Sequence, residues 1–242
     1  MSSKEFSYLA ETLVANFTTP VVLATNNNTV YEEARKFIGP KSTASLEKLY
    51  QVMGEDFNQE KVDELLKAFE PSKFVPRILE MLVCRNVDAV NYYVAQMLRR
   101  VFIQRPDTIK ALEKENPVSM NIILQSGSID EIILKVAEKK VQDLSHMGLV
   151  EIISFINEKL KLGFDSRSSA YQAAFEVYYA RNILVHNGGI VNETYLQKTK
   201  RTDLKVGDPY LLTSIEFTLG TAALVALGYS LDKEFLSHFK LT

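Results

Sequence analysis

The sequence predicts an all-α protein, and three observations support that prediction. Glycine and proline number only ten and seven among 242 residues, and they separate long segments in which apolar residues recur with helical spacing. Capping boxes at 128–131 and 213–216 mark positions where helices begin. Apolar residues make up 46% of the chain and charged residues 24%, which is typical of a globular protein and excludes a disordered or collagen-like one.

The N-terminal region, residues 1–126, is expected to be a series of helices. A first helix is predicted over 4–16, followed by a loop at Thr18-Thr19-Pro20. A long helix is predicted over 72–103, stopped by Pro106 because proline cannot donate a backbone hydrogen bond. Shorter helices are predicted over 29–37, 45–53 and 59–69, with an apolar one that ends near Gln125.

The C-terminal region, residues 127–242, follows the break at Ser126-Gly127-Ser128. Its first helix opens at the Ser128 capping box, in which the serine and Glu131 each satisfy a free backbone N–H. A mostly non-helical stretch over 190–212 is expected to contain a short β-hairpin. The later helices are predicted from Gly148 to about 162, over 168–187 with Asp165 and Ser166 as caps and Gly188-Gly189 as the stop, and from Thr213 to about 239.

The composition excludes several classes of functional site. The single cysteine, Cys84, rules out a disulfide framework and a cysteine-based zinc site. His146, His186 and His238 are too scattered for a histidine metal centre, so we predict no metal and no cofactor. Phosphate-loop and dinucleotide-binding motifs are absent. The net charge of −2 argues against a protein that coats nucleic acid through a global positive field.

We expect a cytoplasmic protein with no membrane partner. The first residues carry an acid early and lack the apolar core of a secretory signal. The longest uncharged stretch, between Glu216 and Asp232, has fifteen residues and is shorter than a membrane span. A lone cysteine also suits a reducing compartment.

The informative motif is Arg181-Asn182-x-x-x-His186, late in a predicted helix and just before the Gly188-Gly189 stop. It resembles the HEPN superfamily, whose catalytic members carry an arginine, a polar residue, three further residues and a histidine on a helix. The likeness covers about residues 128–239, and the continuation through Glu193 is similar to that of bacterial members. Arg85-Asn86 begins in the same way elsewhere but meets Val90 in place of the histidine.

The resemblance implies a HEPN-type helical bundle and a metal-independent endoribonuclease. In such enzymes the ribose 2′-hydroxyl attacks the adjacent phosphate and leaves a cyclic phosphate end. Arg181 and His186 are the expected catalytic residues, because arginine matches phosphate oxygens and histidine exchanges protons near neutral pH. Asn182 is expected to orient His186, with Asn187 in a supporting role.

A homodimer is predicted from two lines of reasoning. On a straight helix, positions 181 and 186 are offset by about 140°, so one chain does not obviously aim both side chains at one phosphate. Two chains related by a twofold axis present the motif twice. The resemblance implies the same arrangement, since HEPN active sites are composite clefts between two domains.

RNA-binding residues are expected around the motif. Lys198, Lys200, Arg201 and Lys205 form a basic cluster suited to phosphates, and a solvated surface loop is the equally weighted alternative. Tyr178 is a candidate for stacking on an unpaired base, and burial in the core is its alternative.

Two functions are therefore carried forward. The first is a ribonuclease of the toxin or phage-defence kind, restrained by an antitoxin, a regulatory protein or its own N-terminal region. Gly188 stands where some toxins of the superfamily carry a tyrosine modified by their antitoxin, which argues against that form of control. The second is a HEPN module without activity that binds RNA, nucleotide or a protein partner.

Overall fold

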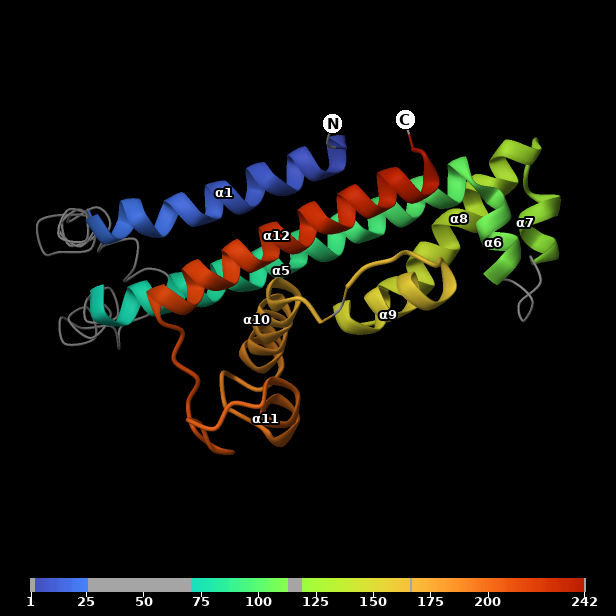
Figure 1. The fold of residues 1–242 in the computed structure, drawn as a ribbon. Helices are drawn as coiled ribbons and strands as arrows, with labels where there is room; N and C mark the ends of the chain where they lie inside the picture. Colours follow the sequence, from blue (N-terminus) through green and yellow to red (C-terminus); the bar gives the residue numbers. More distant parts are fainter. Residues whose placement is uncertain (1–2, 26–70, 113–118, 166, 242) are drawn as a thin grey trace, which may run out of the picture.

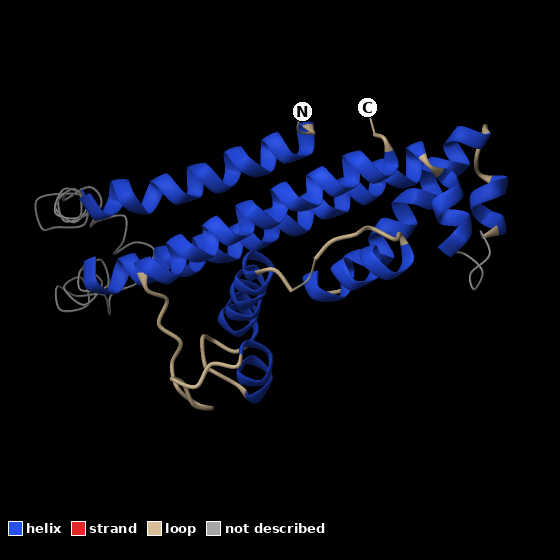
Figure 2. Ribbon diagram, in the orientation of Figure 1, coloured by secondary structure: helices blue, strands red, loops and turns tan. Residues whose placement is uncertain are grey.

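The computed structural model describes residues 3–25, 71–112, 119–165 and 167–241 (Figure 1). These residues are mostly helical and contain no β-strand, which confirms the all-α prediction (Figure 2). The helices predicted over 29–37, 45–53 and 59–69 lie outside the described residues.

Three long helices lie side by side and form the main body: α1 (Lys4–Thr25), α5 (Pro71–Gln104) and α12 (Ser214–Phe239). Helix α5 has 34 residues and is about 51 Å long at 1.5 Å per residue. It matches the long helix predicted from the sequence. Helix α1 runs antiparallel to the other two, so its first residues lie near the end of α12 (Figure 1).

Helix α1 is longer than predicted. The loop expected at Thr18-Thr19-Pro20 is wrong, because the helix continues to Thr25. A proline inside a helix removes one backbone hydrogen bond, and here packing against α5 and α12 outweighs that loss. The predicted stop at Pro106 is confirmed, because α5 ends at Gln104. Pro106 itself begins α6 (Pro106–Leu112), since its missing N–H is unused at a first helical position.

Four shorter helices gather at the far end of α5, where α8 packs against it (Figure 1). Ser128 caps α8 as predicted and accepts from the Glu131 amide at 3.2 Å. The Glu131 carboxylate accepts from Gly127 and not from the cap residue, so the predicted box is half formed. These helices are α6, α7 (Met120–Leu124), α8 (Ile129–Ser145) and α9 (Leu149–Lys159).

Helix α10 (Ser169–His186) crosses the main body and packs against α5 and α12. Its N-cap is Ser168, which accepts from Tyr171 at 3.3 Å, whereas the predicted cap Asp165 accepts from the Arg167 amide. The predicted cap Ser166 lies outside the described residues.

The β-hairpin expected over 190–212 is not formed. Helix α11 (Glu193–Thr199) occupies much of this stretch, capped by Asn192, whose side chain accepts from Tyr195 at 2.8 Å. One antiparallel bridge, Ile190 to Pro209, joins the two ends. The Asn192 cap therefore stabilises a helix in this segment where strand pairing was expected.

Both sequence regions contribute to one core. Leu9 of α1 and Val94 of α5 are buried in the same cluster as Ile153 of α9 and Leu227 of α12. The described part of residues 1–126 therefore packs directly on residues 127–242. The predicted boundary at Gly127 does not divide this core.

Two glycines let neighbouring helices approach α12 closely. A Cβ at Gly220 would lie 2.5 Å from Val177 of α10, and one at Gly228 would lie 2.7 Å from Leu9 of α1. Both distances are too short for real atoms, so the absent side chains fix the spacing of three helices. The contact at Gly220 sets how α10, the motif helix, sits on the bundle.

Helix α12 is long and apolar enough to cross a membrane by length and composition alone. The uncharged stretch between Glu216 and Asp232 was too short to indicate a membrane-spanning length, because the helix continues to Phe239. In the fold, 44% of its most apolar window is buried. Asp232 within the helix is 3% exposed and accepts hydrogen bonds from Ser3 and Tyr93. Helix α12 thus serves as a core helix of the bundle.

Candidate active site

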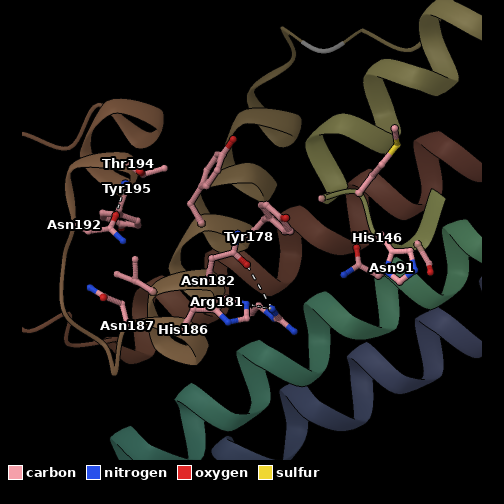
Figure 3. Close-up of a pocket in the computed structure, with 15 residues that line it drawn as sticks. Asn91, His146, Tyr178, Arg181, Asn182, His186, Asn187, Asn192, Thr194 and Tyr195 are labelled. Carbon is pink, nitrogen blue, oxygen red and sulfur yellow. Dashed lines mark hydrogen bonds between the residues drawn. The ribbon is translucent and has the colours of Figure 1, made fainter. Parts of the chain in front are cut away.

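A cleft of about 630 Å³ opens beside the C-terminal half of α10 (Figure 3). Five residues predicted from the motif line it: Tyr178, Arg181, Asn182, His186 and Asn187. The remaining lining residues come from α5, from the turn between α8 and α9, from α10 and from the start of α11. They are Asn91, Ser145, His146, Met147, Gly148, Tyr179, Ile183, Asn192, Thr194 and Tyr195.

Local sequence explains why His186 stands at the end of its helix. Gly188 and Gly189 have φ angles of 60° and 77°, a left-handed conformation that costs glycine little and other residues more. The Gly189 amide turns back and donates to the Ile183 carbonyl at 2.9 Å. The helix therefore stops one turn after Ile183 and leaves His186 exposed at the cleft.

Arg181 and His186 meet within one chain. Arg181 Nη1 lies 3.4 Å from His186 Nε2. The helical offset of the two positions does not separate the functional groups, because the offset describes Cβ positions and the ends of long side chains reach beyond them. The geometric argument for a second chain is therefore wrong, and the homodimer prediction now rests on the resemblance.

The guanidinium of Arg181 has two further neighbours. Its Nη2 donates to Asp88 of α5 at 3.0 Å, and its Nη1 makes a long contact of 3.5 Å with the Asn182 amide oxygen. Asn182 thus contacts Arg181, whereas the sequence reasoning paired it with His186. Asp88 was not predicted, since it lies 93 residues away and no local pattern connects it to the motif.

Arg181 Nε and Asn91 Oδ1 are buried polar atoms of residues that line the cleft, and neither has a hydrogen-bond partner among the described residues. A buried polar atom without a partner costs about 1–3 kcal/mol. Such atoms are rare in folded proteins and call for an explanation. The lining of the cleft therefore includes residues with unsatisfied polar groups beside the motif.

Two titratable side chains near the motif indicate that its surroundings are partly shielded from water. Burial raises the pKa of the Tyr179 hydroxyl, and the negative charge of Glu151 adds to that rise. Burial also raises the pKa of the Cys84 thiol, while the nearby Arg181 charge lowers it. In such surroundings a positive charge acts on a phosphate more strongly than it does in bulk water.

Tyr178 and Asn187 have identifiable contacts in the cleft wall. The Tyr178 ring is half-buried and meets the Tyr179 ring edge-on, with centroids 5.4 Å apart. Its exposed part faces the cleft, so both alternatives raised for it, core and site, are partly realised. The Asn187 side chain donates to the Ile190 carbonyl and holds the end of α10 in place.

The predicted basic cluster does not line the cleft. Lys198 is exposed on α11, and Lys200 is exposed at its C-cap. Arg201 is paired elsewhere: its guanidinium forms ion pairs with Asp203 at 2.6 Å, with Glu216 at 3.0 Å and with Glu176 at 3.1 Å. These partners raise the pKa of Arg201, with the Asp203 hydrogen bond as the largest cause. This arrangement favours a structural role for Arg201 over phosphate binding.

Sequence reasoning missed several residues of the cleft wall, among them His146, Asn91 and Asn192. His146 is the C-cap of α8, and nothing in the local sequence shows which surface that helix end faces. Asn91 lies on the same long helix as Asp88. Within the described ranges, no group of three histidine, cysteine, aspartate or glutamate side chains is placed to hold a metal ion.

Comparison of the chain with protein-family models, with curated proteins and with solved structures finds no match. The HEPN resemblance therefore stands on the Arg181–His186 motif and its helical context.

Proposed function

We propose that the protein is a metal-independent endoribonuclease of HEPN type. The observation that carries the proposal is the contact of Arg181 Nη1 with His186 Nε2, 3.4 Å apart, at the wall of a 630 Å³ cleft. The two side-chain types that the motif supplies for phosphate chemistry are thus neighbours in space. A cleft of this volume accommodates a small ligand such as one or two nucleotides.

The chemistry follows from the two side chains. The ribose 2′-hydroxyl gives its proton to a base in the cleft as its oxygen forms a bond to the adjacent phosphorus. The bond from phosphorus to the 5′-oxygen breaks. Arg181, which only donates hydrogen bonds, neutralises the charge that develops on the phosphate oxygens. His186 protonates the departing 5′-oxygen. The products are a 2′,3′-cyclic phosphate and a 5′-hydroxyl. The reaction consumes no water, and the proposed mechanism uses no metal ion.

The mild negative charge of the chain is compatible with this reaction. A net charge of −2 does not attract long RNA, but a site that grips a few nucleotides needs only local positive charge. Arg181 supplies it at the cleft, and exposed Lys198 and Lys200 lie in the segment that follows the motif. We propose single-stranded RNA as the substrate, because its bases are free to reach Tyr178.

We also propose a biological setting, which rests on the resemblance alone. The protein acts in the cytoplasm as a toxin or phage-defence effector. It associates as a homodimer and is restrained by an antitoxin, a regulatory protein or its own N-terminal region.

Cleavage of total RNA in the presence of EDTA tests the activity. We expect wild type to cut RNA and arrest growth, and Arg181→Ala and His186→Ala to do neither. His238→Ala is the matched control, because this exposed histidine lies in the last turn of α12 and outside the cleft. Equal behaviour of all four proteins contradicts the proposal. RNA binding without cleavage would favour the alternative, a binding module.

Mixing two inactive variants tests whether the site is composite. If each chain holds its own Arg181–His186 pair, a mixture of Arg181→Ala and His186→Ala stays inactive. Restored cleavage in the mixture means that the arginine and the histidine act across a dimer interface. Size-exclusion chromatography with light scattering shows whether the mixture contains dimers.

A further inference from the structure

A second histidine lines the proposed ribonuclease cleft. His146 is the C-cap of α8 and is exposed to solvent. It reaches the cleft from the turn between α8 and α9, an element separate from the motif helix. In the view of Figure 3, Arg181 lies between His146 and His186. The cleft therefore presents two imidazoles and a guanidinium in its lining.

The turn that carries His146 is packed directly against α10. A Cβ at Gly148 would lie 2.3 Å from the Tyr178 hydroxyl oxygen and 2.3 Å from the Glu151 carboxylate. Only glycine permits so close an approach without displacing one of these side chains. The turn and the motif helix are thus in contact beside the cleft, which places the turn of His146 against the helix that carries Arg181.

Asn91 supplies a hydrogen-bond acceptor in the lining of the same cleft. It lines the cleft together with His146, and Asn91 Oδ1 is buried without a partner among the described residues. An imidazole N–H that donates to this oxygen would fix the ring and its tautomer. The other ring nitrogen then faces the cleft as an acceptor.

We propose that His146 is a second catalytic residue of the site, the general base that complements His186. This inference rests on the proposed ribonuclease function. Transfer of the phosphate to the 2′-oxygen requires one group that takes the 2′-hydroxyl proton and another that gives a proton to the 5′-oxygen. His146 takes the 2′-hydroxyl proton and His186 gives a proton to the 5′-oxygen. Arg181 donates hydrogen bonds to the phosphate oxygens. Asn91 is the positioning residue for His146.

The test compares single variants on two substrates. The first is a mixed-sequence RNA oligonucleotide, and the second is the set of four nucleoside 3′-(4-nitrophenyl phosphates). Nitrophenolate departs without a proton, so the second substrate needs a base but no acid. The proteins are wild type, Arg181→Ala, His186→Ala, His146→Ala and His146→Gln, with His238→Ala as control, and circular dichroism verifies that each is folded.

On RNA, we expect His146→Ala and His146→Gln to lower the cleavage rate by about 10²–10⁴-fold, the usual contribution of a general base. On the nitrophenyl esters the loss in His146→Ala persists, whereas the loss in His186→Ala shrinks to less than about tenfold. Added imidazole restores part of the His146→Ala rate. Asn91→Ala lowers kcat and leaves KM unchanged, and Asn91→Asp, which keeps the acceptor oxygen, retains the rate.

The outcomes separate this inference from the function on which it rests. His146 variants that match His238→Ala, while Arg181→Ala and His186→Ala lose cleavage, overturn the role of His146 and leave the ribonuclease standing. Larger recovery of His146→Ala than of His186→Ala on the nitrophenyl esters overturns the assignment of base and acid. A wild type that cleaves neither substrate overturns both proposals.

Discussion

Replacing Tyr93 by phenylalanine tests how the long helices of the bundle are held together. Tyr93 of α5 is 1% exposed, and its hydroxyl donates to Asp232 Oδ1 at 3.2 Å. Asp232 also accepts from the Ser3 amide at 3.0 Å and from the Ser3 hydroxyl. One buried carboxylate therefore joins α1, α5 and α12. Burial raises the pKa of Tyr93, and Asp232 raises it further, so the hydroxyl keeps its proton and donates.

The size of the effect follows from that geometry. A hydrogen bond to a charged group contributes about 1.5–3 kcal/mol, and a 3.2 Å contact belongs at the lower end. We expect Tyr93→Phe to lower the free energy of unfolding by about 1.5 kcal/mol. In a chain of 242 residues this lowers Tm by about 3–6 °C. Tyr92→Phe is the control, since Tyr92 is a 54% exposed neighbour on the same helix and its substitution should cost nearly nothing.

Urea unfolding of a double-mutant cycle measures the bond itself. In an Asp232→Ala background the Tyr93 hydroxyl has lost its acceptor, so Tyr93→Phe should cost less than about 0.5 kcal/mol. The coupling free energy is then about 1 kcal/mol or more. If Tyr93→Phe costs the same in both backgrounds, its effect does not come from Asp232, and the reasoning is refuted.

Three further predictions concern the site and its support. Asp88→Asn removes a negative charge 3.0 Å from Arg181 but keeps an acceptor oxygen, so Arg181 should attract the RNA phosphate more strongly. Steady-state kinetics should show a KM for RNA about twofold to fivefold lower, with little change in kcat. A raised KM contradicts this. Gly220→Ala meets Val177 at 2.5 Å and should destabilise by about 1–3 kcal/mol in urea unfolding, with recovery when Val177→Ala is added; no recovery would place the strain elsewhere. Burial raises the pKa of Glu216, but hydrogen bonds from its helix-cap threonine and an arginine lower it below 4.5. The ionised Glu216 therefore stabilises the fold above about pH 4.5, and this stabilisation is lost as pH falls further. Tm of Glu216→Gln should then fall less steeply with acid than Tm of wild type.

Local signals in the sequence account for most of the helices. The long helix over 71–104 and the motif helix over 169–186 follow from apolar spacing and from the glycine stop. Thr213 forms the predicted capping box with Glu216. Asn192 is a typical helix N-cap and could have predicted α11. The hairpin expected over 190–212 led to a different prediction for this segment.

The site was predictable only as far as local sequence reaches. Arg181 and His186 could be predicted because they lie five residues apart on one helix, so a local motif contains both. Asp88 and His146 come from other helices, and their approach depends on packing contacts such as those at Gly148 and Gly220, which no local pattern encodes. The supposed need for a second chain failed for a related reason, because helix-wheel angles place Cβ atoms and not the ends of long side chains.

The chemistry of the RNA ends tests the central claim most directly. Purified wild type and His186→Ala are incubated with RNA in EDTA, and the products are analysed by mass spectrometry. We predict 2′,3′-cyclic phosphate and 5′-hydroxyl ends with wild type and intact RNA with His186→Ala. Intact RNA with both proteins, or 3′-hydroxyl ends with wild type, would contradict a ribonuclease built on Arg181 and His186.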